Sequence, residues 1–129
     1  MAADSQNSKV NWQKISVHAV TSDNLVSSPD FFEKAAAVAS SKKAAINLRA
    51  HRLGGRRLFE IALKLRKITT AAGTPLVVAG RVDVAIAAGA DAVQLGAHTV
   101  PLEAAAELCG KHGKKFGYSC HSVQEVVAA

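Results

Sequence analysis

The chain has 129 residues, of which 49% are hydrophobic and 20% are charged. This composition supports one folded domain and excludes an intrinsically disordered chain. The net charge is +6, but the basic residues lie in separate segments (SKK, HRLGGRR, KLRK and KHGKK), and aromatic residues do not interleave with them. We therefore interpret most of them as solvated helix faces and loops rather than a nucleic-acid groove, although the positive charge is compatible with a phosphorylated small substrate.

Residues 1–12 are predicted to form a polar leader ahead of a domain over residues 13–129. The segment MAADSQNSKVN has neither the apolar region of a secretory signal nor the arginines of a transit peptide. No apolar run reaches the roughly 18 residues that a membrane helix requires. The two cysteines, Cys109 and Cys120, have no CxxC spacing, which favours a reduced protein. These features predict a cytoplasmic protein with no membrane or nucleic-acid partner.

Strand and helix signals alternate along the chain. Short β-branched or apolar runs predict strands within residues 15–23, 44–50, 74–80, 91–97 and 114–121. Helical patterns follow the first four, within residues 28–43, 51–73, 81–90 and 100–113, and a fifth begins near the end of the chain. Gly73 and Gly89 are expected to end two of these helices, because glycine tolerates the left-handed conformation of a helix terminus.

Strands that are each followed by a helix must run parallel, since only a crossover returns the chain to the same end of the sheet. The fold class is therefore α/β, and an open doubly wound sheet and a (βα)₈ barrel both satisfy the pattern. One observation favours the barrel: polar residues fall on or at the ends of different strands, and barrel strand ends converge on one mouth. These residues are Asn47, Arg49, Gln94, Ser119 and His121.

The chemistry of these residues leaves several roles open. The chain contains no GxGxxG or GxxxxGK[ST] motif, so a nucleotide site has little support. His121 can take up and return a proton near neutral pH, or it can cap the helix that follows. Arg49, predicted on the same strand face as Asn47, needs an anionic partner, which can be a substrate or a structural acid. Gln94 either contacts a ligand or bonds to the backbone.

Four motifs in order resemble the thiamine-phosphate synthase superfamily and, within it, the thiazole tautomerase (TenI-like) branch. They are VHAVTSD, INLRAH, VVAGRVDVAIAAGADAVQLGAHTVP and FGYSCHSVQEVVAA, which lie between Ile15 and Ala129. The resemblance implies a (βα)₈ TIM barrel, of which this chain contains about four βα units and a fifth strand. The later loops that hold the substrate phosphate in this family would then lie beyond Ala129.

The departures from the family pattern concern magnesium. The synthases carry one aspartate after the third strand and another after the fourth, and both hold magnesium; the matching positions here are Gly80 and Thr99. Asn47 and His51 match positions that are glutamine and lysine in the synthases. The resemblance therefore predicts no metal site and no cofactor.

His121 lies in the Ser-x-His-Ser setting that tautomerases use to shuttle a proton on a phosphorylated thiazole. This resemblance predicts His121 as the catalytic residue, with the substrate contacted by Asn47, Arg49, Gln94, Ser119 and Ser122. The leading hypothesis is a thiazole tautomerase-like isomerase of thiamine biosynthesis, present as an amino-terminal fragment that is inactive alone. The alternatives are a diverged thiamine-phosphate synthase, which couples thiazole phosphate with pyrimidine diphosphate, and a non-catalytic half-barrel that must pair with another chain. An incomplete barrel is also expected to self-associate through its open sheet edges.

Overall fold

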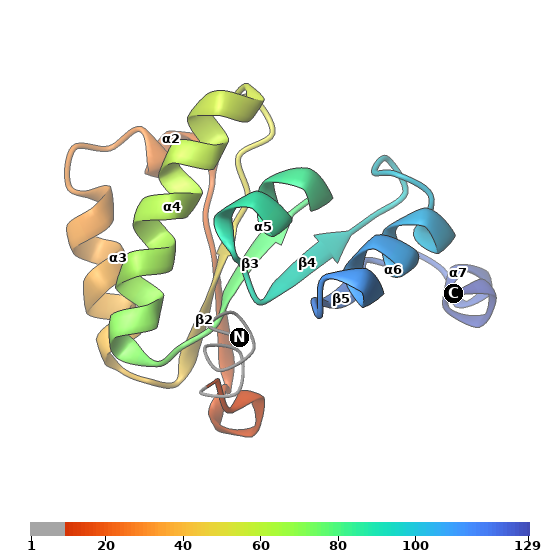
Figure 1. Ribbon diagram of the computed structural model, residues 1–129, viewed down its shortest axis with the longest axis horizontal. Coiled ribbons are helices and arrows are strands. Elements are labelled where there is room, and N and C mark those ends of the chain that lie inside the picture. The colour runs from red at the N-terminus through yellow and green to blue at the C-terminus, as the bar shows by residue number, and fades with distance from the viewer. Residues whose placement is uncertain (1–9) are drawn as a thin grey trace.

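The computed structural model describes residues 10–129 (Figure 1). Five parallel strands form one sheet in which consecutive strands are neighbours, in the order β1-β2-β3-β4-β5. The strands are β1 (Val17–Val20), β2 (Ala44–Leu48), β3 (Leu76–Ala79), β4 (Ala92–Leu95) and β5 (Lys115–Tyr118). A doubly wound sheet reverses its strand order at a switch point, whereas a barrel keeps sequential order. The predicted α/β fold is therefore confirmed as a partial, open barrel of five strands.

Each strand is followed by at least one helix. The helices are α2 (Asp23–Val26), α3 (Phe31–Ser40), α4 (Gly55–Ala72), α5 (Val82–Ala88), α6 (Leu102–Lys111) and α7 (Val123–Ala128), and a 3₁₀ turn, η1 (Trp12–Lys14), precedes β1. Gly73 and Gly89, each with φ of 74°, end α4 and α5 in the left-handed conformation. Both helix ends therefore lie where the sequence predicted them.

The sheet has two different faces. Its outer face packs against α3, α4, α5 and α6 in the main hydrophobic core, to which the strands contribute Ile46, Leu48, Leu76, Val78 and Val93. The opposite face corresponds to the inside of a barrel and carries a smaller cluster of Ala45, Val77 and Ala92, against which Trp12 and Ile15 pack. Small residues on the inner face leave room for side chains that converge from neighbouring strands.

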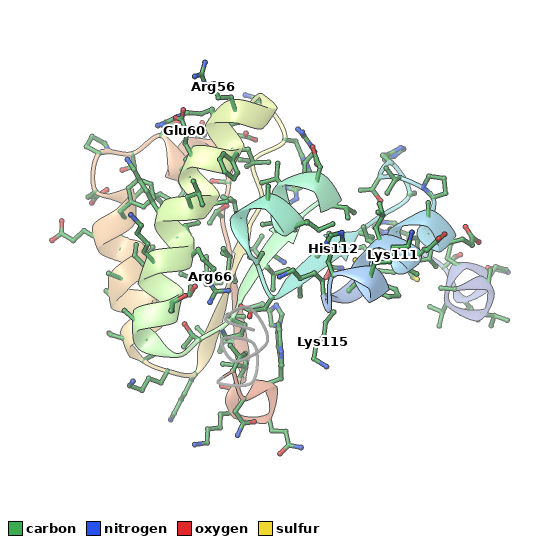
Figure 2. The ribbon with its side chains drawn as sticks, viewed as in Figure 1. Arg56, Glu60, Arg66, Lys111, His112 and Lys115 are labelled. Atoms are coloured by element: carbon green, nitrogen blue, oxygen red, sulfur yellow. The ribbon has the colours of Figure 1, made fainter. Side chains whose placement is uncertain are left out.

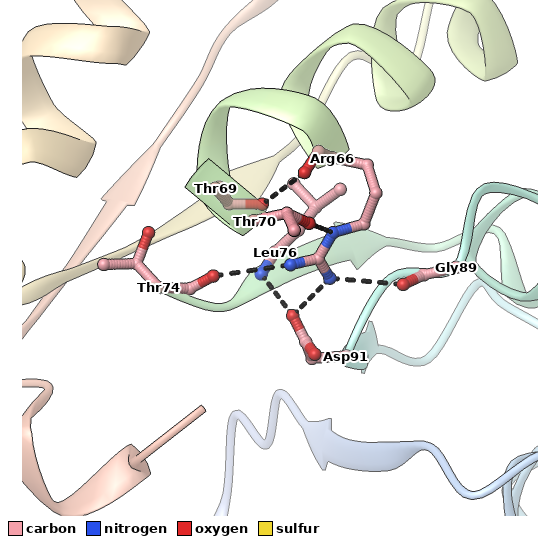
Figure 3. A network of polar contacts seen from close by, with 7 residues as sticks. All are labelled: Arg66, Thr69, Thr70, Thr74, Leu76, Gly89 and Asp91. Atoms are coloured by element: carbon pink, nitrogen blue, oxygen red, sulfur yellow. Dashed lines mark hydrogen bonds and ion pairs between the residues drawn. The ribbon is translucent and has the colours of Figure 1, made fainter. Parts of the chain in front are cut away.

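A buried ion pair joins α4 to the amino ends of β3 and β4 (Figures 2 and 3). Arg66 Nη1 lies 2.6 Å from Asp91 Oδ2 and 3.2 Å from the carbonyl oxygen of Gly89. The same carboxylate oxygen accepts a 2.8 Å hydrogen bond from the backbone N–H of Leu76. Only 16% of the Arg66 side chain and 5% of the Asp91 side chain are exposed. This pair fixes the amino ends of two strands whose other ends form the candidate site.

Apolar side chains are exposed at both edges of the sheet and on α7. Val17 and Val20 on β1 are each 54% exposed, and Phe116 on β5 is 44% exposed. Val127 on α7 is 81% exposed. Within residues 10–129, no helix is both long and apolar enough to cross a bilayer. The proposed leader falls mostly on residues 1–9, outside the described part of the chain, so the boundary at residue 13 stays a prediction.

Candidate active site

A cavity of about 490 Å³ lies at the carboxyl ends of β1 to β5. Five of the six predicted site residues line it: Asn47, Arg49, Gln94, Ser119 and His121. The convergence of strand ends predicted from the sequence is therefore present in the structure. Ser122 is the exception, because it does not line this cavity.

Asn47 supplies the most buried polar group of the cavity wall. It lies on β2 and is only 6% exposed, and its Oδ1 atom has no hydrogen-bond partner among the described residues. Buried amide oxygens in proteins almost always have a partner. Because Asn47 lines the cavity, its amide oxygen can accept a hydrogen bond from a ligand or a water molecule bound there.

Arg49 differs from the sequence prediction. β2 ends at Leu48, so Arg49 begins the loop after the strand and is exposed instead of facing a barrel interior. Among residues 10–129 no carboxylate forms an ion pair with it, so the structural-acid alternative has no support. Its backbone is held instead by Thr21, whose hydroxyl accepts from the Arg49 N–H at 2.8 Å and donates to the Arg49 carbonyl at 2.9 Å. The guanidinium remains available to an anionic ligand.

Gln94 and Ser119 are connected across two neighbouring strands. Gln94 lies on β4, and its Nε2 donates a 2.9 Å hydrogen bond to the hydroxyl oxygen of Ser119, which follows β5. Between them on β5 lies Gly117, where an added β-carbon would come within 2.7 Å of Gln94 Oε1. The absence of a side chain at Gly117 thus allows the carboxamide to cross toward Ser119.

His121 is exposed at the cavity, and its neighbour Ser122 begins α7. The Ser122 hydroxyl accepts a 3.1 Å hydrogen bond from the backbone N–H of Glu125, while the His121 N–H donates to the Glu125 carboxylate. The helix cap is therefore made by Ser122 and Glu125, and the imidazole of His121 does not perform it. This leaves the ring free for a ligand, whereas the predicted contact from Ser122 to substrate remains a prediction.

The structure adds two histidines to the predicted site residues. His51 and His98 follow β2 and β4, and both line this cavity and an adjoining one of about 360 Å³. His98 was not singled out from the sequence, although its place just after a strand was the signal that could have identified it. Together with Arg49 and His121, these side chains place four basic groups around the cavity, whose lining contains no Asp or Glu.

The two positions that carry aspartates in the synthases face each other here. A β-carbon added to Gly80 would lie 3.6 Å from Thr99 Cγ2 and 3.7 Å from His51 Cε1. Magnesium in proteins is usually held through one or two carboxylates. No carboxylate lines either cavity, and no cluster of three or more His, Cys, Asp or Glu among residues 10–129 could hold a metal ion. The residues present do not fit a magnesium ion.

The family profile described as thiamine monophosphate synthase matches residues 17–129, which is nearly the whole chain. The chain belongs to the thiamine monophosphate synthase (TMP-TENI) family. It is 33% identical over 113 residues to a thiamine-phosphate synthase of Clostridium acetobutylicum, covering 88% of this chain and 53% of that protein. It is also 46% identical over 84 residues to a thiamine-phosphate synthase of Methanoculleus marisnigri, covering 65% of this chain and 39% of that protein.

The structure is also similar to that of a thiamine phosphate pyrophosphorylase from Pyrococcus furiosus. The TM-score is 0.77 at 29% sequence identity, and the match covers 90% of this chain and 55% of the other. The chain thus spans about half the length of the relatives that it matches. These results confirm the superfamily predicted from the motifs, but the relatives' names favour the alternative activity, the synthase, over the leading tautomerase hypothesis.

Proposed function

We propose that the protein containing this chain acts in thiamine biosynthesis as a thiamine-phosphate synthase-type enzyme that couples thiazole phosphate with pyrimidine diphosphate. The observation that carries the proposal is the cavity at the strand ends, which gathers Arg49, His51 and His98 without any carboxylate. Both proposed substrates are anions, and a cavity whose lining holds an arginine and several imidazoles but no carboxylate attracts them. The relatives' names favour the coupling reaction as the chemistry performed there.

In this proposal each part of the cavity has a role. Coupling forms a bond from the thiazole nitrogen to the pyrimidine carbon that carries the diphosphate, and the bond from that carbon to the diphosphate oxygen breaks. Negative charge therefore grows on the leaving oxygen as pyrophosphate departs. Arg49 can bind two oxygens of the departing pyrophosphate bidentately, and the imidazoles of His51 and His98 can donate further hydrogen bonds to this group. Gln94, held by Ser119, and the unpartnered amide oxygen of Asn47 would orient the uncharged part of a substrate. Because neither cavity has a carboxylate to hold magnesium, the proposed reaction relies on these side chains alone.

Tautomerisation of a phosphorylated thiazole is the second candidate function. It is favoured by His121, which lines the cavity with an imidazole that is not used to cap α7. A proton shuttle needs one group that both accepts and donates near neutral pH, and it needs no metal. The same cavity without carboxylates is therefore compatible with this reaction.

Two assays on the complete gene product distinguish these functions. One measures thiamine phosphate formed from thiazole phosphate and pyrimidine diphosphate, and the other measures isomerisation of the thiazole carboxylate phosphate. We expect the coupling product to form, and we expect its formation to continue in the presence of EDTA. Isomerisation without coupling would overturn the first function in favour of the second, and the absence of both reactions would overturn both.

A further inference from the structure

Three cationic or potentially cationic side chains line both cavities at the strand ends. Arg49 and His51 come from the loop after β2, and His98 comes from the loop after β4. The two cavities also share Gly80 and Thr99, at the positions where the synthases carry their magnesium-binding aspartates. A cluster of basic side chains therefore surrounds the place where a divalent cation would otherwise sit.

Gly80 leaves the space beside Thr99 and His51 without a side chain. Its φ is +81°, a left-handed conformation that most residues other than glycine, asparagine and aspartate adopt at a cost. Its N–H donates a 2.8 Å hydrogen bond to the carbonyl oxygen of Gln94, which joins the loop after β3 to β4. The added β-carbon described above would meet its neighbours only at ordinary contact distance, so there is room here for a ligand atom between Gly80, Thr99 and His51.

Arg81 does not belong to the same set, although it lines the second cavity. Its Nε and Nη2 atoms contact both carboxylate oxygens of Asp83, at 3.0 and 2.8 Å. The hydrogen bond from Arg81 lowers the pKa of Asp83 below its ordinary value, so this acid is ionised at neutral pH and retains its partner. The charge of Arg81 is thereby largely neutralised.

We propose that Arg49, His51 and His98 bind the diphosphate group of an anionic substrate directly, in place of the magnesium ion that the synthases use. The proposal rests on the proposed function for the identity of the substrate, but it concerns the way in which the anion is held. Arg49 provides a permanent charge and a planar pair of donors, and each imidazole adds one donor directed at a phosphate oxygen. Loss of the two carboxylates removes the groups that would repel an anion bound without metal.

The test is calorimetric titration of the complete gene product with inorganic pyrophosphate, once in EDTA and once in excess MgCl₂. We expect binding in EDTA that magnesium does not strengthen, because free magnesium competes with the protein for the same oxygens. Binding that occurs only with magnesium would overturn the proposal. Because no turnover is measured, this result is independent of the coupling assay, and pyrophosphate binding without coupling would reject the proposed function while keeping the direct anion site.

Substitutions test which residues bind pyrophosphate. Arg49→Gln should weaken pyrophosphate binding in EDTA by about tenfold or more, as expected for a lost charged hydrogen bond. The matched control is Lys111→Gln, which removes one positive charge from the last residue of α6, at the opposite end of the sheet (Figure 2). The control should bind within about twofold of the unmodified protein, because exposed charges at that distance are screened by salt. Equal binding by Arg49→Gln and the unmodified protein would reject the site.

A second variant tests whether a restored carboxylate makes pyrophosphate binding depend on magnesium. Thr99→Asp restores one carboxylate next to His51 without touching the left-handed backbone of Gly80. It should weaken pyrophosphate binding in EDTA by about tenfold, and magnesium should now restore the lost affinity. An unchanged affinity in a variant whose melting temperature is also unchanged would contradict the proposed location.

Discussion

Gly117 and Gln94 lie so close across β5 and β4 that the carboxamide occupies the space of a missing β-carbon, 2.7 Å from where that carbon would be. The contact allows Gln94 to reach Ser119, whose hydroxyl oxygen accepts its 2.9 Å hydrogen bond. Gly117, which has no side chain, thus determines the direction of the Gln94 side chain, which lines the cavity. Gly117 is therefore a positioning residue.

Gly117→Ala should affect ligand binding more than stability. The methyl group would displace the end of a flexible side chain, so we expect the free energy of unfolding to change by less than about 1 kcal/mol. Loss of the bond to Ser119 should weaken binding of thiazole phosphate by about three- to tenfold. Calorimetry and urea denaturation measure the two quantities. Gly110→Ala on α6 is the control, since no atom outside the helix backbone approaches its β-carbon site within 4 Å. An equal loss of binding in this control and in Gly117→Ala would contradict the positioning role of Gly117.

The pair of Arg66 and Asp91 should carry much of the stability of the amino end of the sheet. Asp91→Ala leaves a buried guanidinium unpaired and removes the acceptor of the Leu76 N–H, so we expect the free energy of unfolding to fall by about 3 kcal/mol or more. Glu107→Gln, which breaks an exposed pair with Lys111, should cost less than about 1 kcal/mol. Urea denaturation compares the two variants. Similar losses of unfolding free energy in the two variants would show that burial of the Arg66–Asp91 pair adds nothing to stability.

The sequence predicted most of the fold because the relevant information is local. Periodicity identified the strands and helices, and Gly73 and Gly89 ended α4 and α5 as expected. The strand-end residues could be grouped because parallel strands present their carboxyl ends on the same side. The pairing of Arg66 with Asp91, which are 25 residues apart, could not be predicted, because neither residue carries a local signal for its partner.

The same limit applies to parts of the candidate site. Arg49 was placed on the strand, but the bonds of its backbone with Thr21, 28 residues earlier, set it in a loop. The role of Gly117 was missed because a close approach between neighbouring strands depends on their register. The position of His98 after a strand marks it as a strand-end residue, but only the folded chain brings its loop beside the loop that holds His51.

His121→Asn should separate the two candidate reactions. Asparagine preserves a polar group of similar size but cannot carry a proton, so tautomerisation should fall by about 100-fold or more. Coupling, which requires neutralisation of a leaving group rather than a proton shuttle, should change by less than about threefold. Initial rates in the two assays give the comparison, and His112→Asn at the far end of α6 is the matched control. Isomerisation at the normal rate in His121→Asn would remove this imidazole from the mechanism.

Asp83→Asn should strengthen anion binding by releasing Arg81. At neutral pH the pKa of Asp83, lowered mainly by its hydrogen bond from Arg81, keeps the carboxylate ionised and the pair intact. Without that carboxylate, Arg81 can turn to a phosphate oxygen in the second cavity, so pyrophosphate should bind about threefold or more tightly. Asp30→Asn removes a carboxylate beside α3, away from the cavities, and should leave affinity unchanged. If calorimetry showed equal gains in pyrophosphate affinity for Asp83→Asn and Asp30→Asn, the cause would be the change in net charge and not the release of Arg81.

The isolated 129-residue chain should self-associate. The two edge strands expose unpaired backbone groups together with Val17 and Phe116, and open strand edges recruit further strands. Val126 and Val127 add apolar surface on α7, at 62% and 81% exposure. We expect sedimentation at micromolar concentration to show species larger than the 13.4 kDa monomer.

Charge placed on these surfaces should reverse the association. Val17→Lys and Val127→Lys together should shift the population toward monomer, because charged side chains on an edge strand oppose pairing. Leu63→Lys, on α4 with a side chain that is 39% exposed, introduces the same charge away from both edges and should leave association unchanged. If the unmodified chain were a compact monomer that melts cooperatively, the prediction would be refuted. The exposed strand edges and α7 would then be stable in contact with water.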